Sequence, residues 1–128
     1  MEDISIGVPK PVLERLPEGS EDTQQDMQQA VAGWERRLNS AIDAAADDRE
    51  AAGHVLDAID LFERRMERYD EFVPELRAWG QSPIYAIAWR TLYADLIAQL
   101  YEHEELREHV DVERNARLVE DGIRFGDR

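Results

Sequence analysis

The sequence contains no cysteine among its 128 residues, which excludes disulfide bonds and metal sites built on thiolates. Its seven glycines are scattered singly, so the chain has no glycine-rich loop that could cradle a phosphate. None of its four serines has a histidine within one helical turn in the sequence, as an activated nucleophile on one helix would. These absences predict a protein that is not an enzyme and that carries no cofactor.

Lysine is almost absent as well. Lys10 is the only one, and the other 14 basic residues are arginines, against 29 aspartates and glutamates and a net charge of -14. This much like charge opposes a compact state in dilute buffer, whereas molar salt shortens the Debye length to about 3 Å. The composition resembles that of proteins from extreme halophiles, or from their viruses. An acidic protein from an ordinary GC-rich organism, in which arginine also replaces lysine, is the alternative.

The sequence gives no sign of a membrane segment or a signal peptide. The first five residues carry no basic residue, and the most apolar window, residues 84–100, is interrupted by four polar side chains. We therefore expect a cytoplasmic protein, or a virion protein if the chain is viral. Because an acidic surface repels polyanions and anionic lipids, we expect neither nucleic acid nor membrane as a partner.

Apolar residues recur three and four positions apart in long segments, and no segment alternates with the two-residue period of a strand. This pattern predicts an all-α fold, a bundle of three long amphipathic helices plus a short C-terminal helix, with an irregular N-terminal arm. Residues 1–19 form the predicted arm, and residues 20–128 form a single helical-bundle domain. The predicted helices cover residues 21–46, 48–72, 83–109 and 112–122, with a short helical piece at 74–79.

Capping residues and prolines set the predicted helix ends. Ser20 stands before two acidic residues and is the expected N-cap of the first long helix. Asp47 and Glu50 have the spacing of a capping box at the start of the second. Pro74 removes a backbone donor, so the second helix is expected to end or kink two residues before it. Ser82, followed by proline, predicts the start of the third.

The segment from Glu102 to His109 holds four glutamates and two histidines. Helical bundles build di-metal sites from inward glutamates and Glu-x-x-His pairs. Here leucines, Leu100 and Leu106, stand three residues before His103 and His109, and the apolar seams of the first two helices contain no carboxylate. We therefore expect no metal site. A helical-bundle metal-binding protein or enzyme that uses the Glu102–His109 cluster is the alternative.

The N-terminal arm contains apolar side chains but cannot build a core alone, since five of its first twenty residues are proline or glycine. We therefore expect it to be buried against another protein chain. Trp79, just after the Pro74 break, belongs to no helical seam and is a candidate interface anchor. The predicted interface residues are Ile4, Ile6, Val8, Val12, Leu13, Leu16 and Trp79.

These features together predict a non-catalytic structural or interaction protein, a helical subunit of a larger protein assembly adapted to high salt. Its partners are expected to be other protein chains, in a homo-oligomer or a hetero-assembly. A helical bundle with an extended arm is also similar in outline to the small helical connector subunits of tailed-virus particles. That resemblance implies an alternative, a head–tail connector subunit from a tailed virus of a halophile.

Overall fold

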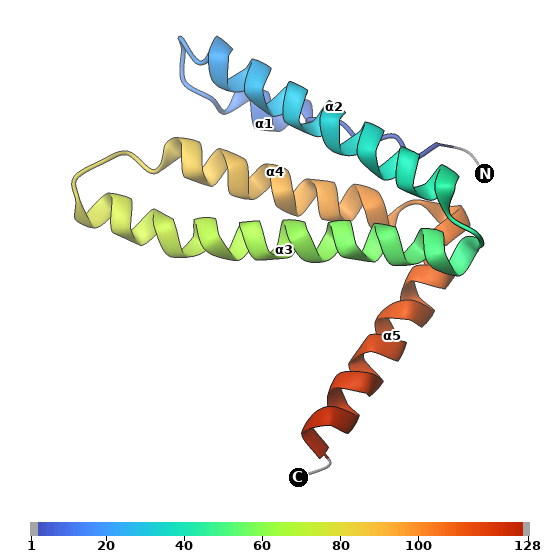
Figure 1. Ribbon diagram of the computed structural model, residues 1–128. Helices are drawn as coiled ribbons and strands as arrows, with labels where there is room; N and C mark the ends of the chain where they lie inside the picture. Colours follow the sequence, from blue (N-terminus) through green and yellow to red (C-terminus); the bar gives the residue numbers. More distant parts are fainter. Residues whose placement is uncertain (1–2, 127–128) are drawn as a thin grey trace.

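A computed structural model describes residues 3–126, with side chains described for all of these except 104–106 and 121–126 (Figure 1). Helices account for most of this part of the chain, which contains no strand, so the predicted all-α class is confirmed. The five helices are α1 (Lys10–Glu14), α2 (Glu21–Ala44), α3 (Asp48–Ala78), α4 (Ile84–Tyr101) and α5 (Glu104–Gly126).

Helices α3 and α4 lie antiparallel and side by side, as Figure 1 shows. A short loop joins them, and Gly80 in this loop has a φ of 74°, the left-handed conformation in which helices commonly end. Helix α2 meets α3 at their shared turn and diverges from it toward the opposite end (Figure 1). This divergence leaves a wedge-shaped space between α2 and the α3–α4 pair.

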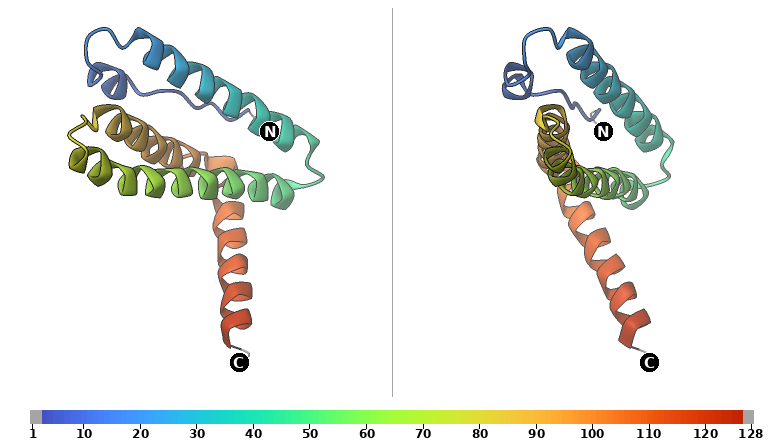
Figure 2. Two further views of the ribbon diagram at one scale, coloured as in Figure 1. Left: turned by 60° about the vertical axis from the view of Figure 1, so that its left-hand side comes forward. Right: turned by 90° about the vertical axis from the view of Figure 1, so that its left-hand side faces the viewer.

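The N-terminal segment fills one side of that space. It runs back along α2 between this helix and α4, and the short helix α1 packs on α4 (Figure 2). Ile4 and Ile6 are buried there, together with Val12 and Leu16 of the α1 region. The segment therefore serves as an additional layer of the bundle.

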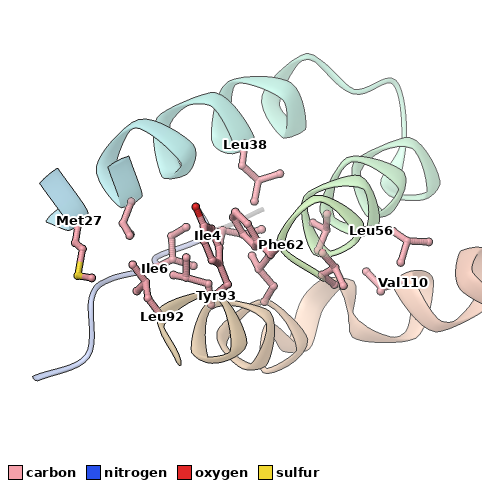
Figure 3. Packing of buried hydrophobic residues seen from close by; sticks show 14 of the residues in the cluster. Ile4, Ile6, Met27, Leu38, Leu56, Phe62, Leu92, Tyr93 and Val110 are labelled. Atoms are coloured by element: carbon pink, nitrogen blue, oxygen red, sulfur yellow. The ribbon is translucent and has the colours of Figure 1, made fainter. Parts of the chain in front are cut away.

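An aromatic cluster lies within the core, and Figure 3 shows two of its members, Phe62 and Tyr93, among the buried aliphatic side chains. Tyr93 of α4 is 3% exposed, and its ring centroid lies 5.6–6.1 Å from those of four other aromatic residues. These are Trp34 on α2, Phe62 and Tyr69 on α3, and Trp89 on α4. Rings at these separations add to the stabilisation that burial of their area provides. The cluster thus joins the three bundle helices at one point.

The predicted capping box between α2 and α3 is present in a slightly shifted form. Asp47 Oδ1 accepts the backbone N–H of Glu50 at 2.8 Å. The Glu50 carboxylate reaches back to the backbone N–H of Ala46 at 3.1 Å, one residue before the N-cap. Both contacts satisfy donors that would otherwise lack partners at a helix start.

Two other predicted caps act differently. Ser20 precedes α2, but its hydroxyl makes no capping bond. It is buried and lies 3.0 Å from the Tyr85 hydroxyl of α4, which ties the start of α2 to the start of α4. Helix α4 begins at Ile84, one residue later than expected, and the Ser82 hydroxyl accepts the Ile84 N–H at 3.4 Å.

Pro74 does not end the second long helix, contrary to the sequence-based prediction of an end near residue 72 and a separate piece at 74–79. Helix α3 continues through Pro74 to Ala78. A proline removes one backbone hydrogen bond from the preceding turn, but that turn is attached to α4 through its side chains. Asp70 pairs with Arg90, and Tyr69 stacks on Tyr93. Tertiary packing therefore outweighs the loss of one bond.

The C-terminal half of the chain also differs from the prediction. The expected helix at 83–109 is two helices, because α4 ends at Tyr101 and α5 begins at Glu104. The expected short helix at 112–122 is the middle of α5, which has 23 residues. The bend between them returns Val110 to the core, where it is 2% exposed. A straight continuation of α4 would carry this valine past the start of α3.

Helix α5 crosses the first half of α3 and then projects away from the bundle, as both views in Figure 2 show. Its first half contacts α3, and its second half extends beyond the other helices (Figure 1). None of the helices in the described residues is both long enough and apolar enough to cross a lipid bilayer.

Candidate interaction surface

The six arm residues that we expected to contact another chain are buried within this one. Ile4, Ile6, Val12 and Leu16 are between 2% and 9% exposed, and Val8 and Leu13 pack against the same core. The arm therefore packs in cis, which corrects the prediction that it needs a partner chain. The wedge between α2 and α4 supplies the apolar surface that the arm lacks by itself.

Three polar side chains, which the sequence analysis did not single out, hold the arm backbone in place. Asn39 of α2 accepts the Ile4 N–H at 2.7 Å and donates to the Ile4 carbonyl at 2.8 Å. Gln99 of α4 makes the same pair of bonds to Gly7, at 3.0 and 2.9 Å. Glu35 accepts the N–H of Ile6 at 2.8 Å. An amide side chain offers both a donor and an acceptor, so it can bond to a backbone N–H and C=O as an adjacent strand would.

Trp79, the seventh predicted interface residue, is exposed. It is the C-cap residue of α3 at the tip of the α3–α4 hairpin, and 65% of its surface is accessible. Large aromatic side chains are frequent anchors of protein interfaces. Its exposure at the hairpin tip permits Trp79 to act as such an anchor, and that role stays a prediction.

The outer side of α4 carries an apolar stripe. Helix α4 packs on two neighbours within the chain, α3 and the layer formed by α2 and the arm. A third side remains, on which residues recur three and four positions apart. We call it the α4 outer stripe; its members are Ile84, Ile87, Thr91, Ala94, Ala98 and Tyr101.

The α4 outer stripe contains no charged residue, although 34% of the chain is charged. Ile84 and Ile87 are 36% and 39% exposed. The Thr91 hydroxyl donates to the Ile87 carbonyl of its own helix at 2.9 Å, so its hydrogen-bonding capacity is used locally. Beside these residues, Val12 and Arg15 of the α1 region complete a mostly apolar groove of about 230 Å³. The stripe is therefore an apolar surface that no described element covers, and the groove runs along one of its edges.

Tyr101 marks the end of the stripe nearest α5. The Arg114 guanidinium lies over its ring, with Cζ 5.1 Å from the ring centroid. The Tyr101 hydroxyl is buried and has no hydrogen-bond partner among the described residues. Burial raises the pKa of this phenol above its ordinary value, and the nearby Arg114 charge opposes the rise. The residue therefore stays neutral at any physiological pH.

Helix α5 presents different surfaces on its two sides. Toward α3 it presents Arg117, whose guanidinium lies 3.0 Å from Asp57 and 3.3 Å from Asp60. Away from α3, Val112 and Val119 are each 60% exposed and lie two turns apart on one face. The helix is thus attached by ion pairs, and apolar side chains face away from the bundle.

The alternative metal cluster at Glu102–His109 is divided by the bend between α4 and α5. His109 lies 3.8 Å from Asp48, at the start of α3. His103 is half-buried at the bend, and its Nδ1 has no hydrogen-bond partner among the described residues. The side chains of residues 104–106 lie outside the description. In the part of the chain that is described, no three histidine, aspartate or glutamate side chains converge as metal ligands would.

These observations define a small all-α bundle with an internal N-terminal arm and two outward apolar surfaces, on α4 and on α5. The chain belongs to the family described as "Family of unknown function (DUF7971)", whose model matches residues 1–127. No curated protein and no solved structure is similar enough to the chain to count as a match.

Proposed function

We propose that this chain is a non-catalytic helical subunit of a larger protein assembly, and that it contacts other protein chains through the α4 outer stripe. The proposal keeps the interaction role that the sequence suggested and moves its site from the arm to α4. Trp79, at the same end of the α3–α4 hairpin as Ile84, supplies a second contact. The structured arm then has an internal task, which is to complete the bundle that presents this surface.

The observation that carries the proposal is the absence of charge along one full side of α4. An apolar side of a helix is ordinarily covered by another element. Among the described residues, α3 and the α2–arm layer cover two other sides of α4. On a protein with a net charge of -14, an uncharged side is also where another chain can approach without repulsion. Small residues at Thr91, Ala94 and Ala98 permit close packing of a partner helix.

A charge placed in the stripe tests this role. In molar KCl, we expect the wild-type chain to sediment above its 14.8 kDa monomer mass, alone or with a chain captured from source-cell lysate. Ile87→Glu should return both preparations to the monomer mass, because it buries an unpaired carboxylate at the contact. Ala32→Glu, on the exposed side of α2, adds the same charge elsewhere and should leave the assembly intact.

Circular dichroism melts of both variants serve as the folding control, since substitutions at exposed sites usually change stability by no more than about 0.5 kcal/mol. A wild-type chain that remains monomeric in both preparations would contradict the proposal. Retention of the partner by Ile87→Glu would also contradict it, and would direct attention to Trp79 and α5.

A further inference from the structure

The wedge between α2 and α3 is open on the side that the arm does not fill. A cleft of about 350 Å³ lies there, in the size range of sites for small organic molecules. Its floor is apolar and consists of Leu38 from α2 with Leu61 and Phe62 from α3. We call it the α2–α3 cleft.

The charges around the α2–α3 cleft are opposite in sign to those of the chain as a whole. Arg37, His54 and Arg65 line it, and none of its lining residues is acidic. The chain has 29 acidic and 15 basic residues, so a site lined only by bases is unusual for it. Within residues 3–126, neither Arg37 nor Arg65 forms an ion pair with a carboxylate of the described side chains.

The Arg65 guanidinium is held in place without being neutralised. Its Cζ lies 5.4 Å from the Trp34 ring centroid and 5.8 Å from that of Tyr93. One of its nitrogens donates to the Tyr93 hydroxyl at 3.1 Å. A guanidinium has five N–H donors in a fixed plane, so further donors remain for a second acceptor. Aromatic contacts fix the orientation of this cation at the edge of an apolar floor.

We propose that the α2–α3 cleft binds a small organic anion, a carboxylate on a compact apolar body. The carboxylate accepts hydrogen bonds from Arg65, with Arg37 adding positive potential at the rim and His54 lining the same side. The apolar body rests on the floor formed by Leu38, Leu61 and Phe62. This pairing accounts for both the cations and the apolar lining, whereas an inorganic anion would use only the cations. The site is separate from the α4 outer stripe and does not depend on a protein partner.

The test uses the full-length chain, with 2-naphthoate as the probe and the indole N–H signal of Trp34 in nitrogen-15 NMR as the readout. We expect saturable shifts with a dissociation constant below about 1 mM. Arg65→Gln should weaken binding by about tenfold or more, since a charge-assisted hydrogen bond is lost. Arg68→Gln removes the same charge from α3 outside the cleft, and should change binding by less than about twofold.

A ligand analogue and a second variant separate the proposal from simpler explanations. The neutral analogue 2-naphthalenemethanol should bind about tenfold more weakly or worse, because it lacks the carboxylate. Arg37 is exposed, and its side chain donates to the Gly33 carbonyl of its own helix, so Arg37→Gln gives a second variant if Arg65→Gln does not fold. It should weaken binding several-fold.

Three results would overturn the proposal. One is the absence of Trp34 shifts up to about 10 mM naphthoate, far above the affinity that a formed site of this size supports. Another is equal binding of the acid and the alcohol, or equal binding by wild type and Arg65→Gln, which would leave only a non-specific apolar contact. The last is displacement of naphthoate by equimolar sulfate, which would reduce the site to one for inorganic anions.

Discussion

The two ends of the chain use apolar side chains in opposite ways. The N-terminal arm has little regular structure apart from the five-residue helix α1, yet its isoleucines at 4 and 6 are almost completely buried. Helix α5 is regular over 23 residues, yet Val112 and Val119 face away from the bundle. In this protein, regular secondary structure at a chain end is therefore no guide to whether that end belongs to the core.

The two ends are also attached to the bundle by different kinds of contact. The arm is held by burial and by hydrogen bonds from Asn39 and Gln99 to its backbone. Among the described side chains of α5, Val110 is buried, and Arg114 and Arg117 form ion pairs with acidic residues of α3. Exposed ion pairs contribute about 0–1 kcal/mol each, and a fully buried isoleucine about 1.5–3 kcal/mol. The irregular end should therefore contribute most to the stability of the fold.

Removal of residues 1–18 provides the strongest test of this difference, and should abolish the cooperative thermal transition. The four buried aliphatic side chains of the arm together account for roughly 6–12 kcal/mol, as much as the whole stability of a typical domain. Ending the chain at Glu120, beyond the contacts of Arg117 with α3, should lower the melting temperature by only a few degrees. Circular dichroism melts in molar KCl measure both.

A milder variant keeps the arm and removes one of the side chains that bond to its backbone. Asn39→Ala leaves the N–H and carbonyl of Ile4 without partners, and should cost about 1–3 kcal/mol. An arm deletion that melts at the wild-type temperature would instead mean that the arm covers the bundle without stabilising it.

Salt should stabilise the bundle as a whole without strengthening the attachment of α5. Between about 0.1 and 3 M KCl, screening of the net charge of -14 should raise the melting temperature by roughly 10 °C, equivalent to about 2–3 kcal/mol. Over the same range the ion pairs of Arg117 should weaken, so amide exchange in the C-terminal half of α5 should not slow. A melting temperature that is flat across the series would contradict the expected adaptation to high salt.

The smallest expected effect is at Val119. Because this side chain is 60% exposed, Val119→Ser should change the free energy of unfolding by less than about 0.5 kcal/mol. Ile6→Ser, an aliphatic-to-serine change in the arm, should cost several kcal/mol. Urea unfolding curves of the two variants give the comparison directly, and equal losses would mean that α5 is buried in solution.

The predictable part of the fold was the part governed by local periodicity. The seams of the first two long helices and the turn at Asp47 were identified from residue spacing and capping. Pro74 misled the prediction because the contacts that carry the helix through it, Asp70 with Arg90 and Tyr69 with Tyr93, join residues far apart in the sequence. Local rules describe the cost of a proline but not the packing that offsets it.

The candidate surfaces were harder to predict for a related reason. An apolar pattern shows that a face avoids water, but not whether the covering layer comes from the same chain. Ile4 and Ile6 were expected at an interface and are buried within the chain, whereas Ile84 and Ile87 of α4 are partly exposed. A usable signal was present in α4, where Thr91, Ala94 and Ala98 continue the pattern with small, uncharged residues.

The hydrogen bonds to the arm backbone also bear on the order in which the protein folds during synthesis. Gly7 is bonded to Gln99, 92 positions later in the chain, while Ile4 and Ile6 are bonded to α2, 35 and 29 positions later. During synthesis the arm emerges before α4 and therefore cannot reach its final position until α4 has been made. Contacts this distant in sequence close slowly, so the arm should be among the last segments to become ordered.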